Sequence, residues 1–203
     1  MAQSHVLKES PSQTAGPYVH IGLTPNFAEI SGVYPHDLGA TMITGDAAGE
    51  HINLCLRVLD GMDEPMRDAL VEIWQADNAG VYNSPSETRG QADPHFTGWG
   101  RKAADPQSGE FHFATIKPGR APHPDGRPMA PHISVWIVAR GINIGLHTRV
   151  YFADEEQANT EDPVLARIEH RKRVQTLMAI RKGDTYSLDI HLQGKRETVF
   201  FDI

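Results

Sequence analysis

The chain has 203 residues, of which 39% are hydrophobic, and a formal net charge of -7 at pH 7. This length and apolar content suit one domain with one substantial core, which we expect to span residues 1–203, with residues 1–25 as an N-terminal arm. The acidic balance argues against a nucleic-acid or anionic membrane partner, because either is itself negative and would need a basic patch. The polar N-terminus, the lack of an apolar stretch of membrane-spanning length and the single cysteine, Cys55, favour a reducing, cytoplasmic location.

Alternating apolar residues predict a series of short strands along the chain. The predicted strands cover residues 51–59, 70–75, 110–116, 132–139, 144–151, 176–181, 186–192 and 197–201. Asp162-Pro163 before an apolar pattern predicts a short helix, with Asp as its N-cap and Pro at its first position. Residues 83–109 and 119–130 are rich in turn-forming residues and are predicted to be long loops. This pattern predicts an all-β fold, a β-sandwich with an immunoglobulin-like or transthyretin-like core, long loops and one or two short helices.

The strand predicted at 132–139 has the geometry of half a metal site. Residues two apart in a strand point to the same face, so a His-x-His pair can place two imidazoles on one ion. Here the pair is His132 and Ser134, and a serine hydroxyl is a poor transition-metal ligand compared with imidazole or a phenolate. The strand therefore has the spacing of a two-histidine metal site but only one of the two histidines.

Generic catalytic signatures are missing from the sequence. There is no Gly-rich phosphate loop ending in Lys-Ser/Thr, no G-x-S-x-G elbow and no H-E-x-x-H helix. The other ten histidines are dispersed and lack ligand spacing. Nucleotide-binding and serine-hydrolase functions therefore have little support.

Five segments of the chain form a combination of high specificity. They read P-S-Q-T-A-G-P-Y-V-H-I-G at 11–22, E-I-W-Q-A-D-N-A-G at 72–80, D-P-H-F-T-G-W-G-R at 93–101, T-I-K-P-G at 115–119 and A-P-H-I-S at 130–134. Together they resemble the intradiol ring-cleavage dioxygenases over nearly the whole chain. Within that family the arm, residues 139–152 and the tail at 197–203 resemble chains of the α type, which pair with a homologous β chain.

The resemblance implies where a metal would be sought. Catalytic chains of the family hold a non-haem ferric ion with two tyrosines and two histidines, and the matching positions here are Thr88, Ala121, His132 and Ser134. One ligand of four cannot hold Fe(III), because phenolates supply the charge and the hard oxygens that this oxidation state favours. We therefore expect no metal and no catalytic residue in this chain alone, with Fe(III) in the β chain. Tyr82 and Tyr151 are interpreted as packing aromatics.

The resemblance also places Thr14, Gly16, Pro17 and Tyr18 of the arm against a bound aromatic acid, with Arg140 beside it. Gly16 allows close backbone approach, Pro17 fixes the chain direction, and Arg140 can counter a benzoate carboxylate. The implied reaction is the opening of 3,4-dihydroxybenzoate between its hydroxyl-bearing carbons with O2, to give 3-carboxy-cis,cis-muconate in the β-ketoadipate pathway. The implied assembly is a higher oligomer of α–β pairs, and the arm and the apolar tail are candidate intersubunit contacts.

Two alternatives of other classes stay open at this point. A self-sufficient intradiol enzyme would build its metal site from unexpected residues, and the isolated chain would then be iron-bound and coloured by phenolate-to-iron charge transfer. A non-enzymatic β-sandwich that binds a partner protein fits the composition equally well. In that case, substitution of Arg140 or Thr14 would leave ring cleavage by a co-expressed chain untouched.

Overall fold

The computed structural model describes residues 14–16, 18–143 and 145–202, so Pro17 of the arm lies outside the described residues. The described strands are β1 (His51–Leu59), β2 (Leu70–Trp74), β3 (Trp99–Ala103), β4 (Glu110–Ile116), β5 (His132–Val138), β6 (Leu146–Phe152), β7 (Met178–Lys182) and β8 (Thr185–His191). The described helices are short: α1 (Val19–Leu23), α2 (Glu156–Glu161) and the 3-10 helices η1 (Leu165–Arg167) and η2 (Arg171–Leu177). The predicted all-β class with short helices is thus confirmed.

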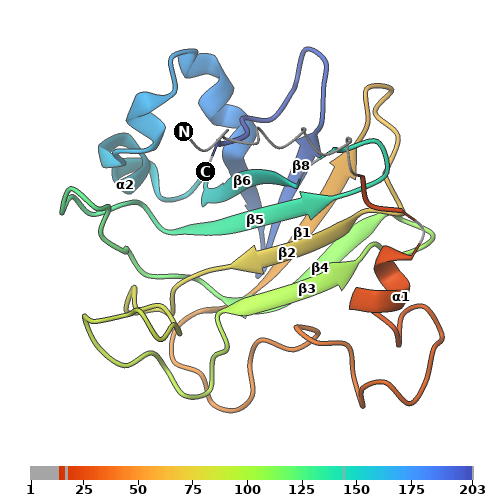
Figure 1. Ribbon diagram of the computed structural model, residues 1–203. Coiled ribbons are helices and arrows are strands. Elements are labelled where there is room, and N and C mark those ends of the chain that lie inside the picture. Colours follow the sequence, from red (N-terminus) through yellow and green to blue (C-terminus); the bar gives the residue numbers. More distant parts are fainter. Residues whose placement is uncertain (1–13, 17, 144, 203) are drawn as a thin grey trace, which may run out of the picture.

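The strands follow one another through a single mixed sheet in the order β3-β2-β5-β6-β7-β8-β1-β4. Most neighbours are antiparallel, whereas β1 with β8 and β6 with β7 are parallel. The two end strands, β3 and β4, lie close to each other, so the sheet curls until it is nearly closed (Figure 1). The α2, η1 and η2 helices gather outside the sheet near β6.

Apolar residues at every second position of β1 and β5 point inward and form much of the hydrophobic core. Ile52, Leu54, Leu56 and Val58 of β1 are at most 3% exposed, and their polar neighbours face outward. In β5 the inward residues are Ile133, Val135 and Ile137. Each such side chain contributes about 1.5–3 kcal/mol when it is fully buried, so the inward register of both strands is strongly fixed. His132 and Ser134 consequently lie on the opposite face of β5.

Most strand boundaries agree with the sequence predictions, and the exceptions have local causes. Strand β3 falls inside the loop predicted at 83–109, because its side chains are mostly half-exposed and show no apolar alternation. The strand predicted at 197–201 is wrong, since the only bridge there pairs Phe201 with His147. The tail is tied by isolated bonds instead, such as the one from Thr148 Oγ1 to the Val199 carbonyl at 2.7 Å.

The predicted helix after Asp162 is reduced to the three-residue 3-10 turn η1. Its N-cap position is Val164 rather than Asp162, but Asp162 still holds the start of the turn, because its Oδ1 accepts from the amides of Val164 and Leu165, both at 2.8 Å. Its Oδ2 also accepts from the Ala130 amide at 2.7 Å, which ties the turn to the start of β5. None of the described helices is long and apolar enough to cross a membrane.

Candidate functional site

The face of β5 that carries His132 is buried at His132 and half-buried along the rest of the strand, and β6 lies beside it. In the antiparallel register, His132 lies opposite Tyr151 and Ser134 lies opposite Arg149. The His132 side chain is only 4% exposed, and its Nδ1 donates to the Ala130 carbonyl at 2.8 Å. The imidazole is therefore held in one tautomer by the backbone just before β5.

Arg149 determines the electrostatic environment of His132 and Ser134. Its Nη1 lies 3.3 Å from Tyr151 Oη and 3.4 Å from Met129 Sδ, and its guanidinium lies 5.9 Å from the Phe201 ring centroid. Burial, and then the nearby Arg149 cation, lower the pKa of His132 to about 4, so the ring is neutral at pH 7. A metal cation placed opposite Ser134 would meet a fixed positive charge. The sequence offered no sign of this role, because it depends on the β5–β6 register.

The remaining positions matched to iron ligands carry neither an imidazole nor a phenolate. Thr88 is exposed in a loop, Ala121 is buried with only a methyl group, and Ser134 is half-buried. Tyr82 is half-buried and stacks on Trp74, with ring centroids 6.0 Å apart and planes 11° from parallel, as the packing interpretation requires. Within the described part of the chain, His132 belongs to no group of three His, Cys, Asp or Glu side chains within ligating reach. These residues do not fit a ferric ion.

A second cluster lies at the far end of β5, where the arm meets the turn after the strand. Thr14 Oγ1 donates to the Ala139 carbonyl at 3.2 Å and accepts from the Gly141 amide at 2.9 Å. These two bonds bracket Arg140, whose Nε lies 3.2 Å from Asp68 Oδ2. The structure thus places Thr14 against the backbone on either side of Arg140, and it adds Asp68, which the sequence did not single out.

Gly16 and Tyr18, the next described residues of the arm, are open to their surroundings. A Cβ at Gly16 would meet nothing within 4 Å, and the Gly16 carbonyl accepts from the Val19 amide at the start of α1. Tyr18 is 76% exposed and Arg140 has an 80% exposed side chain. A shallow pocket of about 370 Å³ adjoins Arg140 and Asp68. Its lining includes the cations Arg67 and Arg140 and the carboxylates Asp60 and Asp68, whereas Thr14 and Tyr18 do not line it. An exposed guanidinium beside a hollow suits the carboxylate of an aromatic acid.

The clusters around His132 and Arg140 cannot both contact one small ligand within this chain. They lie at opposite ends of β5, which runs from His132 to Val138, with Arg140 beyond its end. Six residue steps of about 3.3 Å separate these ends by about 20 Å. A benzoate-sized molecule is far shorter than this distance.

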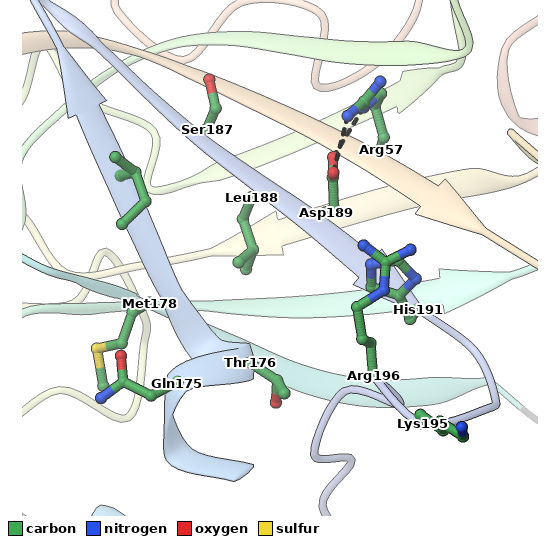
Figure 2. A pocket seen from close by; sticks show the side chains of 11 residues that line it. Arg57, Gln175, Thr176, Met178, Ser187, Leu188, Asp189, His191, Lys195 and Arg196 are labelled. Atoms are coloured by element: carbon green, nitrogen blue, oxygen red, sulfur yellow. Dashed lines mark hydrogen bonds and ion pairs between the residues drawn. The ribbon is translucent and has the colours of Figure 1, made fainter. Parts of the chain in front are cut away.

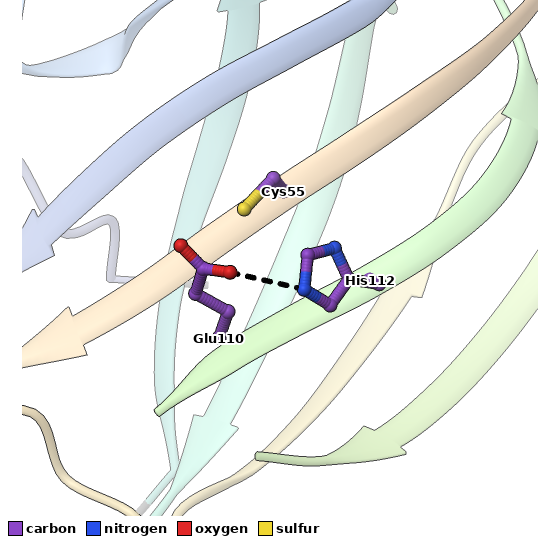
Figure 3. Close-up of side chains that lie close together, drawn as sticks. All are labelled: Cys55, Glu110 and His112. Carbon is purple, nitrogen blue, oxygen red and sulfur yellow. Dashed lines mark ion pairs between the residues drawn. The ribbon is translucent and has the colours of Figure 1, made fainter. Parts of the chain in front are cut away.

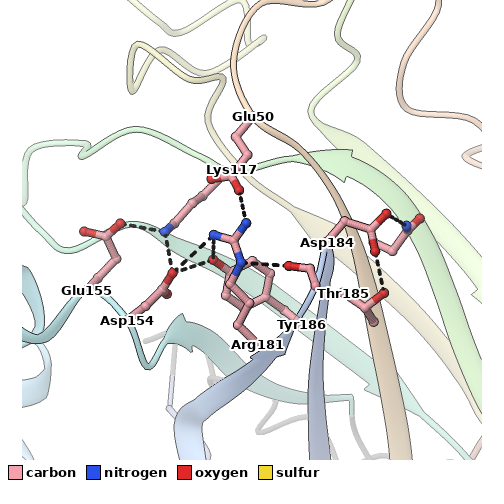
Figure 4. Close-up of polar contacts among 10 residues, drawn as sticks. Glu50, Lys117, Asp154, Glu155, Arg181, Asp184, Thr185 and Tyr186 are labelled. Atoms are coloured by element: carbon pink, nitrogen blue, oxygen red, sulfur yellow. Dashed lines mark hydrogen bonds and ion pairs between the residues drawn. The ribbon is translucent and has the colours of Figure 1, made fainter.

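Two other polar regions contain none of the predicted residues. A pocket of about 540 Å³ runs over β7 and β8, beside the Arg57–Asp189 ion pair at 2.7 Å (Figure 2). At another edge, Lys117 lies 2.7 Å from a Glu155 oxygen and 3.2 Å from one of Asp154 (Figure 4). That second network is internally paired and links the end of β4 to the turn after β6, so we interpret it as structural.

Comparison with known proteins gives the family. The dioxygenase family model matches residues 23–194. The chain is 46% identical to the protocatechuate 3,4-dioxygenase alpha chain of Pseudomonas putida, over 97% of this chain and 98% of that one. It is 33% identical to the beta chain of the Burkholderia cepacia enzyme, over 84% of this chain and 77% of that one.

Solved structures agree at the level of the fold. The 3-chlorocatechol 1,2-dioxygenase of Rhodococcus opacus superposes with a TM-score of 0.57 at 21% identity, over 90% of this chain and 71% of that one. At this level of identity, the structural similarity supports only the fold, a nearly closed sheet. The family model and the sequence relatives show that this chain belongs to the intradiol ring-cleavage dioxygenase family.

Proposed function

We propose that this chain is the α-type subunit of a protocatechuate 3,4-dioxygenase, which shapes the substrate pocket while a homologous β chain holds Fe(III). The observation that carries the proposal is the separation along β5. The groups suited to an aromatic acid lie at one end, and the position matched to the metal, at the other end, holds Arg149 instead of a ligand set. A complete site therefore needs a metal from another chain, brought to the Arg140 end.

In the proposed complex this chain binds and orients the substrate. Arg140 would release Asp68 and pair with the carboxylate of 3,4-dihydroxybenzoate, leaving the two hydroxyl groups directed toward the partner. Thr14 would hold the arm in place, and Gly16 would let the backbone approach the ring. Pro17 and Tyr18 complete the proposed binding segment. The overall reaction inserts both atoms of O2 and gives 3-carboxy-cis,cis-muconate.

The proposal also includes the domain organisation and the oligomeric assembly. The single-domain organisation of residues 1–203, the arm at 1–25 as a partner-reaching segment and a higher oligomer of α–β pairs are part of it. The curated beta chain relative supports the existence of a homologous partner type. Tail residue Phe201, which packs against the Arg149 guanidinium, is a candidate for the chain's contact with the partner.

The experiment is protocatechuate-dependent O2 uptake by three preparations: this chain alone, a β-type chain alone, and the two co-expressed. The proposal predicts ring cleavage with normal affinity only in the co-expressed preparation. Turnover by this chain alone would overturn it. Equal turnover by the β-type chain with and without this chain would show that this chain contributes nothing to the pocket.

A further inference from the structure

A group of potential metal ligands lies on the outer face of the sheet, away from both clusters on β5. Cys55 of β1 stands directly opposite His112 of β4 in the antiparallel register. Glu110 is two residues before His112, so its side chain points to the same face. One ligand atom from each of the three residues lies within 4.8 Å of the other two (Figure 3).

We propose that Cys55, Glu110 and His112 form a surface site for a divalent metal of the zinc type, with water at the fourth position. Thiolate, imidazole and carboxylate are the ligands that Zn²⁺ takes in proteins, whereas Fe(III) favours hard oxygen ligands. Tetrahedral ligands at zinc lie about 3.5 Å from one another, given bond lengths of about 2.0–2.3 Å. The three side chains therefore need movements of only about 1 Å, and none of them is fully buried.

The surrounding charges favour a cation. Glu110 lies 3.1 Å from His112 Nε2, and Asp189 of the neighbouring β8 also acts on the thiol. Arg57 is the nearby cation, but it is engaged by Asp189 through two hydrogen bonds of 2.7 Å. With Cys55 as thiolate, these groups sum to a negative charge. Partial burial and then Glu110 raise the pKa of the Cys55 thiol, so the thiol lacks the acidity of a catalytic nucleophile.

The site would join an end strand of the sheet to its neighbour. Among the described strands, β4 is the last in the sheet order and pairs with β1 alone. A metal held by one β1 side chain and two β4 side chains would strengthen that pairing. This role is independent of the proposed catalytic partnership and of any iron.

The test exploits the fact that Cys55 is the only cysteine in the chain. The full-length chain, freed of metal, is titrated with Co²⁺ and then with Zn²⁺, and the reaction of Cys55 with a thiol reagent is followed with and without Zn²⁺. We expect a thiolate-to-cobalt charge-transfer band that Zn²⁺ displaces, and slower thiol modification in Zn²⁺. Cys55→Ser should abolish the band, and His112→Ala should weaken binding by at least about tenfold.

The matched control is His123→Ala, which removes another histidine that pairs with a carboxylate, Asp125, at 2.9 Å. It should leave the cobalt band and the Zn²⁺ protection unchanged. The proposal fails if Zn²⁺ does not slow thiol modification in the wild-type chain, a result that needs no variant to fold. It also fails if the cobalt band persists in Cys55→Ser, or if His112→Ala binds as tightly as the wild-type chain.

Discussion

Replacement of Thr14 by valine tests how the arm is held against the turn that carries Arg140. Valine keeps the shape of the side chain but loses the hydroxyl that donates to the Ala139 carbonyl and accepts from the Gly141 amide. A hydrogen bond of this kind contributes about 0.5–1.5 kcal/mol, and the bond to Gly141 is exposed, so the two together are worth about 1–2 kcal/mol. The ratio of held to released arm should fall by about 5–30-fold.

The assay is steady-state O2 uptake with 3,4-dihydroxybenzoate, using the enzyme assembled with its β-type partner. KM should rise by up to about 30-fold, because the binding-competent arm becomes less populated, while kcat changes less. Thr14→Ser is the matched control and should stay near wild type, since it keeps the oxygen. Wild-type kinetics in Thr14→Val, or an equal loss in Thr14→Ser, would refute the reasoning.

Three further perturbations probe the binding groups, the buried histidine and the fold. Arg140→Ala should lower kcat/KM for 3,4-dihydroxybenzoate relative to catechol by about tenfold or more, because only the acid has a carboxylate to pair, and an unchanged ratio would contradict this role. The pKa of His132 is lowered from 6.5 to about 4, so the unfolded chain binds the extra proton and the free energy of unfolding should fall by about 3 kcal/mol as pH drops through that window. In the His132→Gln variant, urea unfolding measured between pH 6.5 and about pH 4 should no longer show this fall in the free energy of unfolding. The same pH dependence in wild type and variant would exclude His132 as its source. Gly80 has φ +79° and a Cβ there would lie 2.2 Å from the Arg120 carbonyl oxygen, so Gly80→Ala should cost about 2–4 kcal/mol. Gly126→Ala, at φ +87° in open space, should cost only about 1 kcal/mol, and equal costs in urea unfolding would argue against the clash.

The sequence predicted the strands whose inward faces are continuous and apolar. In β1 and β4 the alternation is strict, and the observed bounds match the predicted ranges 51–59 and 110–116. Strand β3 could not be found in this way, because it pairs with β2 while leaving most of its side chains half-exposed. The tail was overpredicted for the opposite reason, since its apolar residues pack on the sheet without forming a ladder.

The candidate site was predictable in part. The motif residues Thr14 and Arg140 lie 126 positions apart in sequence, and only the resemblance suggested that they meet. Their hydrogen-bonded arrangement is visible in the structure alone. The importance of Arg149 depends on strand register, which places it opposite Ser134. No spacing rule within a single segment contains that information.

These features give one physical account of a chain that keeps the family's fold while lacking its metal ligands. Near Ser134, the Arg149 guanidinium, held by Tyr151 and Phe201, supplies positive charge. His132 stays neutral at pH 7 because its burial, and then the nearby Arg149 cation, lower its pKa. At the other end of β5, Arg140 remains 80% exposed and available to an incoming anion. Under the proposed function, this exposed end of the strand would form one wall of the substrate pocket.

A chain that supplies pocket surface and no metal centre should hold no iron of its own. Iron content can be measured in the assembled enzyme and in this chain after the two subunits are separated. We expect one iron per α–β pair and an iron-free, colourless isolated chain. Two irons per pair, or iron with phenolate-to-iron charge-transfer colour in the isolated chain, would contradict it.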